Sequence, residues 1–119
     1  MTNNEVILDT NAVLRFITGD NIEKCQKVSD LINTNDCIVL IEVIAEVVYN
    51  LEKFYMYPRN LIADEIKDFI AIKENLVFEE NVIRHGCNTF ASTNFDFIDC
   101  LLSHTPMLKE IRSLLLTMT

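Results

Sequence analysis

The chain has 119 residues and a formal net charge of −8, and half of its residues are hydrophobic. This length suits one domain with a hydrophobic core, and the low glycine and proline content indicates regular elements joined by short connections. An acidic chain repels nucleic acid unless cations or a local basic patch intervene, which argues against a plain DNA- or RNA-binding module. No apolar run reaches the roughly 20 residues of a membrane helix and the N-terminus lacks a signal-peptide pattern, so we expect a cytoplasmic protein.

The first predicted element is a strand at residues 6–8, which runs directly into Asp9. Its continuous apolar character is typical of a strand buried on both faces in a parallel sheet. Asp9 would then lie at the carboxyl end of the strand, where open α/β folds bind ligands and where a poorly solvated carboxylate needs a metal or a donor. Thr10 and Asn11 follow, and either can cap the helix that begins at Ala12. The simpler interpretation is that Asp9 is a plain N-cap residue, and this segment alone favours it.

Apolar residues at helical or strand spacing predict the other elements. We expect helices at 12–17, 22–32, 41–55, 58–70, 82–91 and about 95–102, and strands at 37–40 and 76–78. The predicted inward positions of the helices after residue 20 are Ile22, Cys25, Val28, Leu31, Ile32, Ile41, Ile44, Ala45, Val48, Leu51, Tyr55, Ile62, Ile66, Phe69, Ile70, Ile83, Cys87, Phe90, Ala91, Ile98, Leu101 and Leu102. Strands that alternate with helices predict a parallel sheet covered by helices on both sides.

Three further acids are embedded in apolar sequence. Asp96 and Asp99 are three residues apart in the last predicted helix and therefore share a face, and Glu46 stands within the apolar run 44–48. Two desolvated acids repel each other unless a cation lies between them, and Mg²⁺ and Mn²⁺ prefer carboxylate and water oxygens. Each acid alone has a simpler interpretation, as a helix N-terminal acid or as a residue at the edge of a buried stripe. The recurrence of the feature in three segments favours a metal site.

Three blocks of the sequence, 6–16, 43–52 and 96–102, together resemble a PIN domain, most of all the VapC-type toxins of bacterial toxin–antitoxin pairs. The resemblance covers residues 5 to about 102. It implies a three-layer α/β/α sandwich with a central parallel sheet, in a single domain over residues 1–119. It also implies an Mg²⁺- or Mn²⁺-dependent endoribonuclease with an RNA substrate, a cognate antitoxin protein as partner, and a homodimer.

The resemblance assigns roles to single residues. Asp9, Glu46 and Asp99 match the catalytic, metal-binding acids of the family, and Asp96 matches a frequent accessory acid. Asn11 matches an orienting polar residue, and the neighbouring threonine does so less closely. Metal ions held by these carboxylates would activate a water molecule and stabilise the leaving oxygen of a phosphodiester.

The segment 103–119 departs from the family pattern, in which a further strand typically ends in Thr-Phe-Asp and supplies another acid. This chain has no acid after Glu110, and its tail could be a helix or a strand. One hypothesis is a reading frame shifted near residues 102–103. One permitted coding of residues 109–119, translated from its third base, gives Gly-Asp-Lys-Ile-Phe-Thr-Phe-Asp-Asn-Asp. The altered end would remove a carboxylate neighbour of Asp9 and leave the first strand at a sheet edge, so we expect weakened metal binding and activity.

Other kinds of site have less support. His85 and His104 lack matched acid or cysteine spacing, so we expect surface or satisfied histidines. The four cysteines lie beside apolar residues without a C-x-x-C pair, so we expect reduced core thiols. No glycine-rich phosphate loop is present, and residues 9–11 lack the Asp-x-Asp pattern of an acidic phosphatase pocket. Two alternatives stay open: an impaired PIN module that acts through partner binding, and a different metal-dependent phosphoesterase that uses the same acids.

Overall fold

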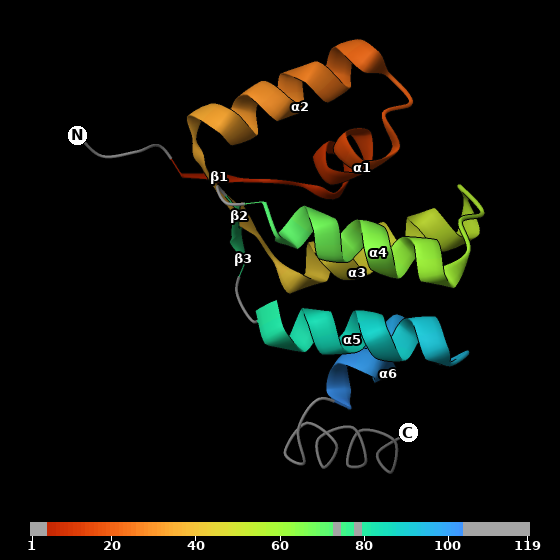
Figure 1. The fold of residues 1–119 in the computed structure, drawn as a ribbon. Helices are drawn as coiled ribbons and strands as arrows, with labels where there is room; N and C mark the ends of the chain where they lie inside the picture. Colours follow the sequence, from red (N-terminus) through yellow and green to blue (C-terminus); the bar gives the residue numbers. More distant parts are fainter. Residues whose placement is uncertain (1–4, 73–74, 78–79, 104–119) are drawn as a thin grey trace.

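The computed structural model describes residues 5–72, 75–77 and 80–103. In chain order these form β1 (Glu5–Ile7), α1 (Thr10–Thr18), α2 (Ile22–Thr34), β2 (Asp36–Val39), α3 (Ile41–Lys53), α4 (Arg59–Ile70), β3 (Asn75–Val77), α5 (Glu80–Ser92) and α6 (Phe97–Leu102) (Figure 1). Strands alternate with helices as predicted, which confirms the α/β class. Of the atypical tail 103–119, only Ser103 lies within the described residues.

The three described strands form one parallel sheet in the order β1-β2-β3. Ile7 pairs with Ile38 across the first pair of strands, and Val39 pairs with Val77 across the second. Because the strands are parallel, their carboxyl ends lie at the same edge of the sheet. The segments that lead into α1 and α3 therefore both begin at this edge. Within the described sheet β1 has a neighbour on one side, and it occupies an outer position.

The strand β1 is less buried than its apolar sequence predicts. Ile7 is 61% exposed and Val6 is half-buried, whereas Leu8, just beyond the strand, is buried. The prediction of a strand buried on both faces is therefore wrong. The physical reason is its outer position in the described sheet, because elements that cover the central strand β2 shield an outer strand incompletely.

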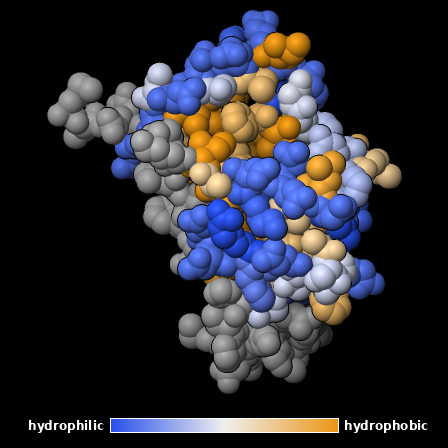
Figure 2. All heavy atoms as spheres, in the orientation of Figure 1, coloured by the Kyte–Doolittle hydropathy of each residue, from blue (hydrophilic) through white to orange (hydrophobic). Residues whose placement is uncertain are grey.

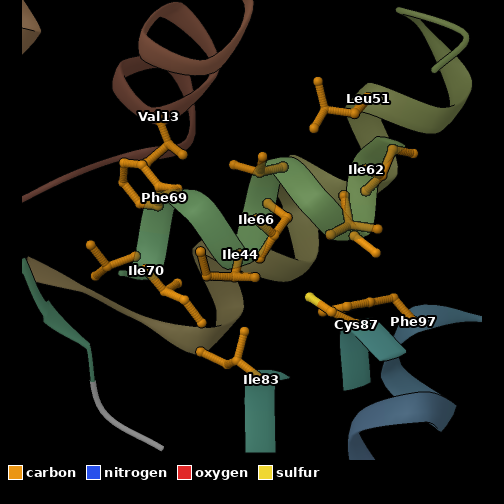
Figure 3. Packing of buried hydrophobic residues seen from close by; sticks show 14 of the residues in the cluster. Val13, Ile44, Leu51, Ile62, Ile66, Phe69, Ile70, Ile83, Cys87 and Phe97 are labelled. Carbon is orange, nitrogen blue, oxygen red and sulfur yellow. The ribbon is translucent and has the colours of Figure 1, made fainter. Parts of the chain in front are cut away.

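The helices lie in the order α2, α1, α3 with α4, α5 and α6 across the molecule (Figure 1). The central helix α4 buries every inward position that its apolar spacing predicts, and each of these side chains is at most 3% exposed: Ile62, Ile66, Phe69 and Ile70. Figure 3 shows them among buried side chains of α1, α3, α5 and α6. No polar or charged residue is buried among the described residues, so apolar packing holds this core together.

Three predicted inward positions face solvent instead. Ile22 at the start of α2 is 85% exposed, and Ala91 near the end of α5 is also exposed, because both helix ends extend past the core. The helix α6 begins at Phe97 rather than near residue 95, and Ile98 is 46% exposed. Phe97 packs edge to face against Phe90 of α5, with ring centroids 5.6 Å apart. This aromatic contact sets the rotation of α6 about its axis.

An apolar surface lies between α2 and α4, at the level of α1 (Figure 2). A shallow cleft of about 190 Å³ is lined there by Phe16 and Ile17 of α1 together with Phe69 and Ile72. The rings of Phe16 and Phe69 meet edge to face, with their centroids 5.7 Å apart.

Among the described residues, no helix is both long enough and apolar enough to cross a membrane.

Three of the four cysteines are buried free thiols, in agreement with the predicted core thiols. These are Cys37, Cys87 and Cys100, while Cys25 is half-buried. Burial raises the pKa of Cys87 to about 12 because the thiolate would lose its hydration. This thiol therefore stays protonated, and it behaves as a small apolar side chain of the core.

Candidate active site

Asp9 ends the connection after β1 and begins α1. Its Oδ1 accepts a hydrogen bond of 2.8 Å from the backbone N–H of Ala12, so Asp9 is the N-cap residue of α1. The capping role considered for Asp9 is thus confirmed, and Thr10 and Asn11 lie in the first turn of α1 instead of capping it. The side chain of Asp9 is exposed, so the prediction of poor solvation is wrong. A cap bond occupies one carboxylate oxygen, and capping is therefore compatible with metal binding.

A hydrogen bond joins this first acidic segment to α3. The hydroxyl of Thr10 donates to Glu46 Oε2 at 2.7 Å, across 36 positions in the sequence. The bond is possible because α1 and α3 both start at the carboxyl edge of the parallel sheet. Glu46 is exposed on the polar face of α3, together with Glu42. The structure therefore brings Glu46 beside the residue that follows Asp9.

The other two acids lie at the start of α6. Asp96 occupies the N-cap position without a side-chain cap bond, and it is exposed. Asp99 lies in the first turn and is half-buried. Asp96 lines a cleft of about 370 Å³ between α3, α5 and α6, together with Tyr49 and Glu52 of α3. Glu46 lies six residues before Glu52 on the same helix, ~9 Å along its axis, so α3 borders both groups of acids.

The four carboxylates have the donor chemistry that Mg²⁺ and Mn²⁺ prefer. Their arrangement fits such an ion in part: within the described ranges, no three acid, cysteine or histidine side chains are placed to hold a metal ion. That Asp9, Glu46, Asp96 and Asp99 share an ion therefore stays a prediction. The further acid of the family pattern would fall beyond Ser103, outside the described residues.

Sequence reasoning missed two residues of the cleft, Glu52 and Arg59. Arg59 Nη1 lies 2.9 Å from Glu52 Oε2, and about a quarter of each side chain is exposed. Arg59 is the first residue of α4, where the positive end of the helix dipole disfavours a cation. An arginine directly after Pro58, at the start of a helix, is electrostatically unfavourable unless an acidic side chain lies beside it. This unfavourable position of Arg59 is the sequence signal that could have identified the Glu52–Arg59 pair.

A model of the PIN domain family matches residues 6–114, which is most of the chain. The chain belongs to the PIN domain family. Its α/β architecture with a parallel sheet is consistent with the α/β/α fold of this family. PIN domains are generally nucleases, and they typically use divalent metal ions. A search of curated proteins and a search of solved structures found no significant match.

The matched range of this PIN domain contains all the sequence blocks that carry the resemblance, 6–16, 43–52 and 96–102. It also contains the four candidate acids and both candidate orienting residues. The family therefore makes a nuclease-type hydrolase the starting point for its function.

Proposed function

We propose that this PIN domain is a divalent-metal-dependent endoribonuclease that acts in the cytoplasm as the toxin of a type II toxin–antitoxin pair. The observation that carries the proposal is the family match together with the Thr10–Glu46 hydrogen bond. This bond holds Glu46 beside the segment that contains Asp9. Two acids from distant parts of the chain are thereby kept at one edge of the sheet, where open α/β folds bind their ligands.

In this proposal Asp9, Glu46 and Asp99 hold the metal, and Asp96 is an accessory acid. The chemistry that a bound Mg²⁺ or Mn²⁺ supplies is the activation of water and the stabilisation of the leaving oxygen of a phosphodiester. The hydroxyl of Thr10 orients the carboxylate of Glu46 through its 2.7 Å hydrogen bond. A polar neighbour that fixes a metal-binding carboxylate in this way raises metal affinity. Asn11, exposed in the first turn of α1, is the second orienting residue in the proposal.

The net charge of −8 supports both the metal dependence of the nuclease and the antitoxin partner. An acidic protein binds a phosphate backbone poorly unless cations lie between them, which fits a metal-dependent nuclease. The same charge suits a basic segment of an antitoxin partner, and we propose such a partner and a homodimer for the toxin. A short open reading frame directly upstream that encodes a small DNA-binding protein is the observation that tests the pairing.

The first experiment measures Mn²⁺-dependent cleavage of RNA by the wild-type protein and by Asp9→Asn. We expect the variant to lose more than the roughly 10–100-fold that changes in the outer shell of a metal site cost. Asp64→Asn is the matched control, because this exposed acid lies on α4 and pairs with Lys67 at 3.9 Å. Equal cleavage by the wild-type protein and Asp9→Asn would mean that a contaminant is responsible, and the proposal would fail. Small phosphate esters tested in parallel separate the ribonuclease from a general phosphoesterase.

A second candidate function is an impaired PIN module that acts through partner binding. It is favoured by the spread of the four acids over the described residues and by exposed apolar side chains at the α3–α6 cleft, Tyr49 and Ile98 among them. The frameshift hypothesis links the two candidates, because a chain with the restored end would regain an acid. We expect that restored chain to cleave RNA faster than the present one. Equal rates would contradict the hypothesis, and sequencing the gene tests it directly.

A further inference from the structure

Arg59 connects three helices through a single side chain. From the first residue of α4, its Nη1 donates to Glu52 on α3 at 2.9 Å, and its Nε donates to the carbonyl of Phe90 on α5 at 3.0 Å. Its Nη2 donates to the carbonyl of Phe95, directly before α6. The guanidinium carbon also lies 3.6 Å from the centroid of the Phe90 ring. All three nitrogen atoms of the guanidinium thus have partners on other segments of the chain.

The hydrogen bond to the carbonyl of Phe95 matters because this residue lies directly before the start of α6. Phe95 immediately precedes Asp96, the N-cap residue of α6, and the carbonyl of Asp96 accepts a hydrogen bond of 3.0 Å from the backbone N–H of Cys100. A shift at residue 95 would therefore move the first turn of α6, which carries Asp99. Other bonds of the loop are local: the backbone N–H of Phe95 donates to Thr93 Oγ1 at 3.3 Å, and Thr93 Oγ1 donates to the carbonyl of Thr89 at 2.7 Å. The carbonyl of Phe95 also accepts a weak bond from the thiol of Cys100 at 3.9 Å, so Arg59 is its charged donor.

The chemistry of the contact requires an arginine. A guanidinium is planar and presents five N–H donors in a rigid fork, so it can bind two carbonyl groups and a carboxylate at once while it stacks on an aromatic ring. A lysine has a compact ammonium on a flexible stem and cannot keep this geometry. Glu52 on α3 accepts a hydrogen bond from Nη1 of the guanidinium. This bond directs the other N–H donors toward the carbonyls of Phe90 and Phe95. The cleft between α3, α5 and α6 thereby contains an oriented guanidinium, and Lys53 lies 4.0 Å from the other oxygen of Glu52.

We propose that Arg59, oriented by Glu52, is a positioning residue that fixes the loop 93–96 and with it the angle at which α6 presents Asp96 and Asp99. The part of this inference that concerns metal binding rests on the proposed function. The part that concerns the loop rests on the contacts of Arg59 alone. Arg59 does not touch the candidate metal position in this proposal, and it acts through the two acids of α6.

The test compares Arg59→Lys, which keeps the charge, and Arg59→Met, which keeps an apolar stem over the Phe90 ring, with the wild-type protein. The matched control is Arg84→Met, because Arg84 lies on α5 and pairs with Glu80 within its own helix at 3.0 Å. If the Arg59 variants fold poorly, the milder variant Glu52→Gln still tests the proposal. Two quantities are measured on each full-length protein: amide hydrogen exchange over residues 93–103 relative to 62–70, and the Mn²⁺ dissociation constant by calorimetry.

We expect Arg59→Lys to accelerate exchange over residues 93–103 about tenfold, with residues 62–70 unchanged, because hydrogen bonds from a charged donor are lost there. We expect its Mn²⁺ dissociation constant to rise about tenfold, as for other changes behind metal ligands. Glu52→Gln should show smaller changes of the same kind, and Arg84→Met should show neither.

Two results would overturn the inference. If exchange over 93–103 stays at the wild-type rate, or rises only in step with 62–70, Arg59 serves general stability and does not fix the loop. If exchange rises but Mn²⁺ affinity does not change, the loop does not position the acids. A wild-type protein that takes up no Mn²⁺ would refute the proposed function instead, and the exchange rates would then decide the role of Arg59 by themselves.

Discussion

The core around α4 and the rim that carries the acids are built on opposite principles. In the core, Ile62 and Ile66 are fully buried within a cluster of hydrophobic side chains, and no polar or charged residue is buried among the described residues. On the rim, Asp9, Glu46 and Asp96 are exposed. The side chain of Asp9 caps α1, and that of Glu46 accepts a hydrogen bond from Thr10. The core gains its free energy from area removed from water, whereas the rim keeps charged groups in water at little cost.

In this PIN domain, stability and the proposed chemistry are therefore carried by separate residues. A change in the core should unfold the protein, and a change on the rim should alter metal binding or cleavage while the fold remains. Asp9 is the exception, because it both caps α1 and stands among the proposed metal ligands. Substitutions in the core and at Asp9 test this separation and its exception.

The largest expected effect on stability belongs to Ile66→Ala in the centre of the core. Removal of this fully buried side chain should lower the free energy of unfolding by about 2–5 kcal/mol, because it loses buried apolar area and leaves a cavity. Leu61→Ala on the exposed side of the same helix is the control, with an expected loss below about 1 kcal/mol. Urea denaturation followed by circular dichroism measures both. Similar losses for the two variants would break the contrast between core and surface.

Asp9 should show two separable losses. Asp9→Ala removes the cap and should cost about 1 kcal/mol of stability, whereas Asp9→Asn keeps a good cap residue and should cost almost none. Both variants should lose Mn²⁺-dependent cleavage, because neither side chain is a carboxylate. Asn21→Ala is the matched control: it removes the N-cap of α2, which accepts a 2.9 Å bond from Lys24, and should cost the same stability while it preserves cleavage.

Denaturation curves and cleavage rates on the same four proteins check this prediction. If Asp9→Asn lost as much stability as Asp9→Ala, the cap bond would not be the structural role of this residue. If Asn21→Ala abolished cleavage as Asp9→Ala does, the loss would reflect helix stability and not a missing ligand.

The smallest expected effect concerns Asp20, between α1 and α2. Burial raises the pKa of its carboxyl, but hydrogen bonds from Arg15, Thr18 and Tyr55 and the charge of Arg15 together lower it below the usual 3.8. Because the pKa is lower in the folded state, this carboxylate stabilises the protein above pH 3.8, and the contribution is lost as the pH falls through the folded pKa.

Asp20→Asn should therefore be less stable than the wild-type protein near neutral pH, and the difference should shrink below pH 3.8. Urea midpoints of the two proteins, measured at a series of pH values, check this. Tyr55→Phe, which removes the 3.2 Å bond to Asp20, should show a weaker form of the same trend. A difference that grows as the pH falls would contradict the sign of the pKa shift.

The core of this domain was largely predictable from its sequence. The spacing of Ile62, Ile66, Phe69 and Ile70 predicted most of the buried face of α4, because a helix buried along one side must repeat its apolar residues every three or four positions. The buried Ala63 was not predicted. The blocks that resemble a PIN domain likewise identified the family that the family model confirms. Both results depend on residues that are close together in the chain.

The candidate site was less predictable because its geometry depends on distant segments. The burial of β1 failed to follow its apolar sequence, since an outer strand receives less cover than a central one. The rotation of α6 was predicted wrongly because the Phe90–Phe97 contact sets it. The role of Arg59 has no periodic signal at all, because its partners lie on three other segments.

Local spacing and short motifs encode the elements, most of the buried face of α4 and the family, so these could be predicted from the sequence. Three features follow from packing between distant segments: the Thr10–Glu46 hydrogen bond, the solvation of Asp9, and the bonds of Arg59 to α3, α5 and the segment before α6. The reason is physical: hydrogen bonds and solvent exposure at a site depend on which segments pack side by side, and that choice is made by the whole core.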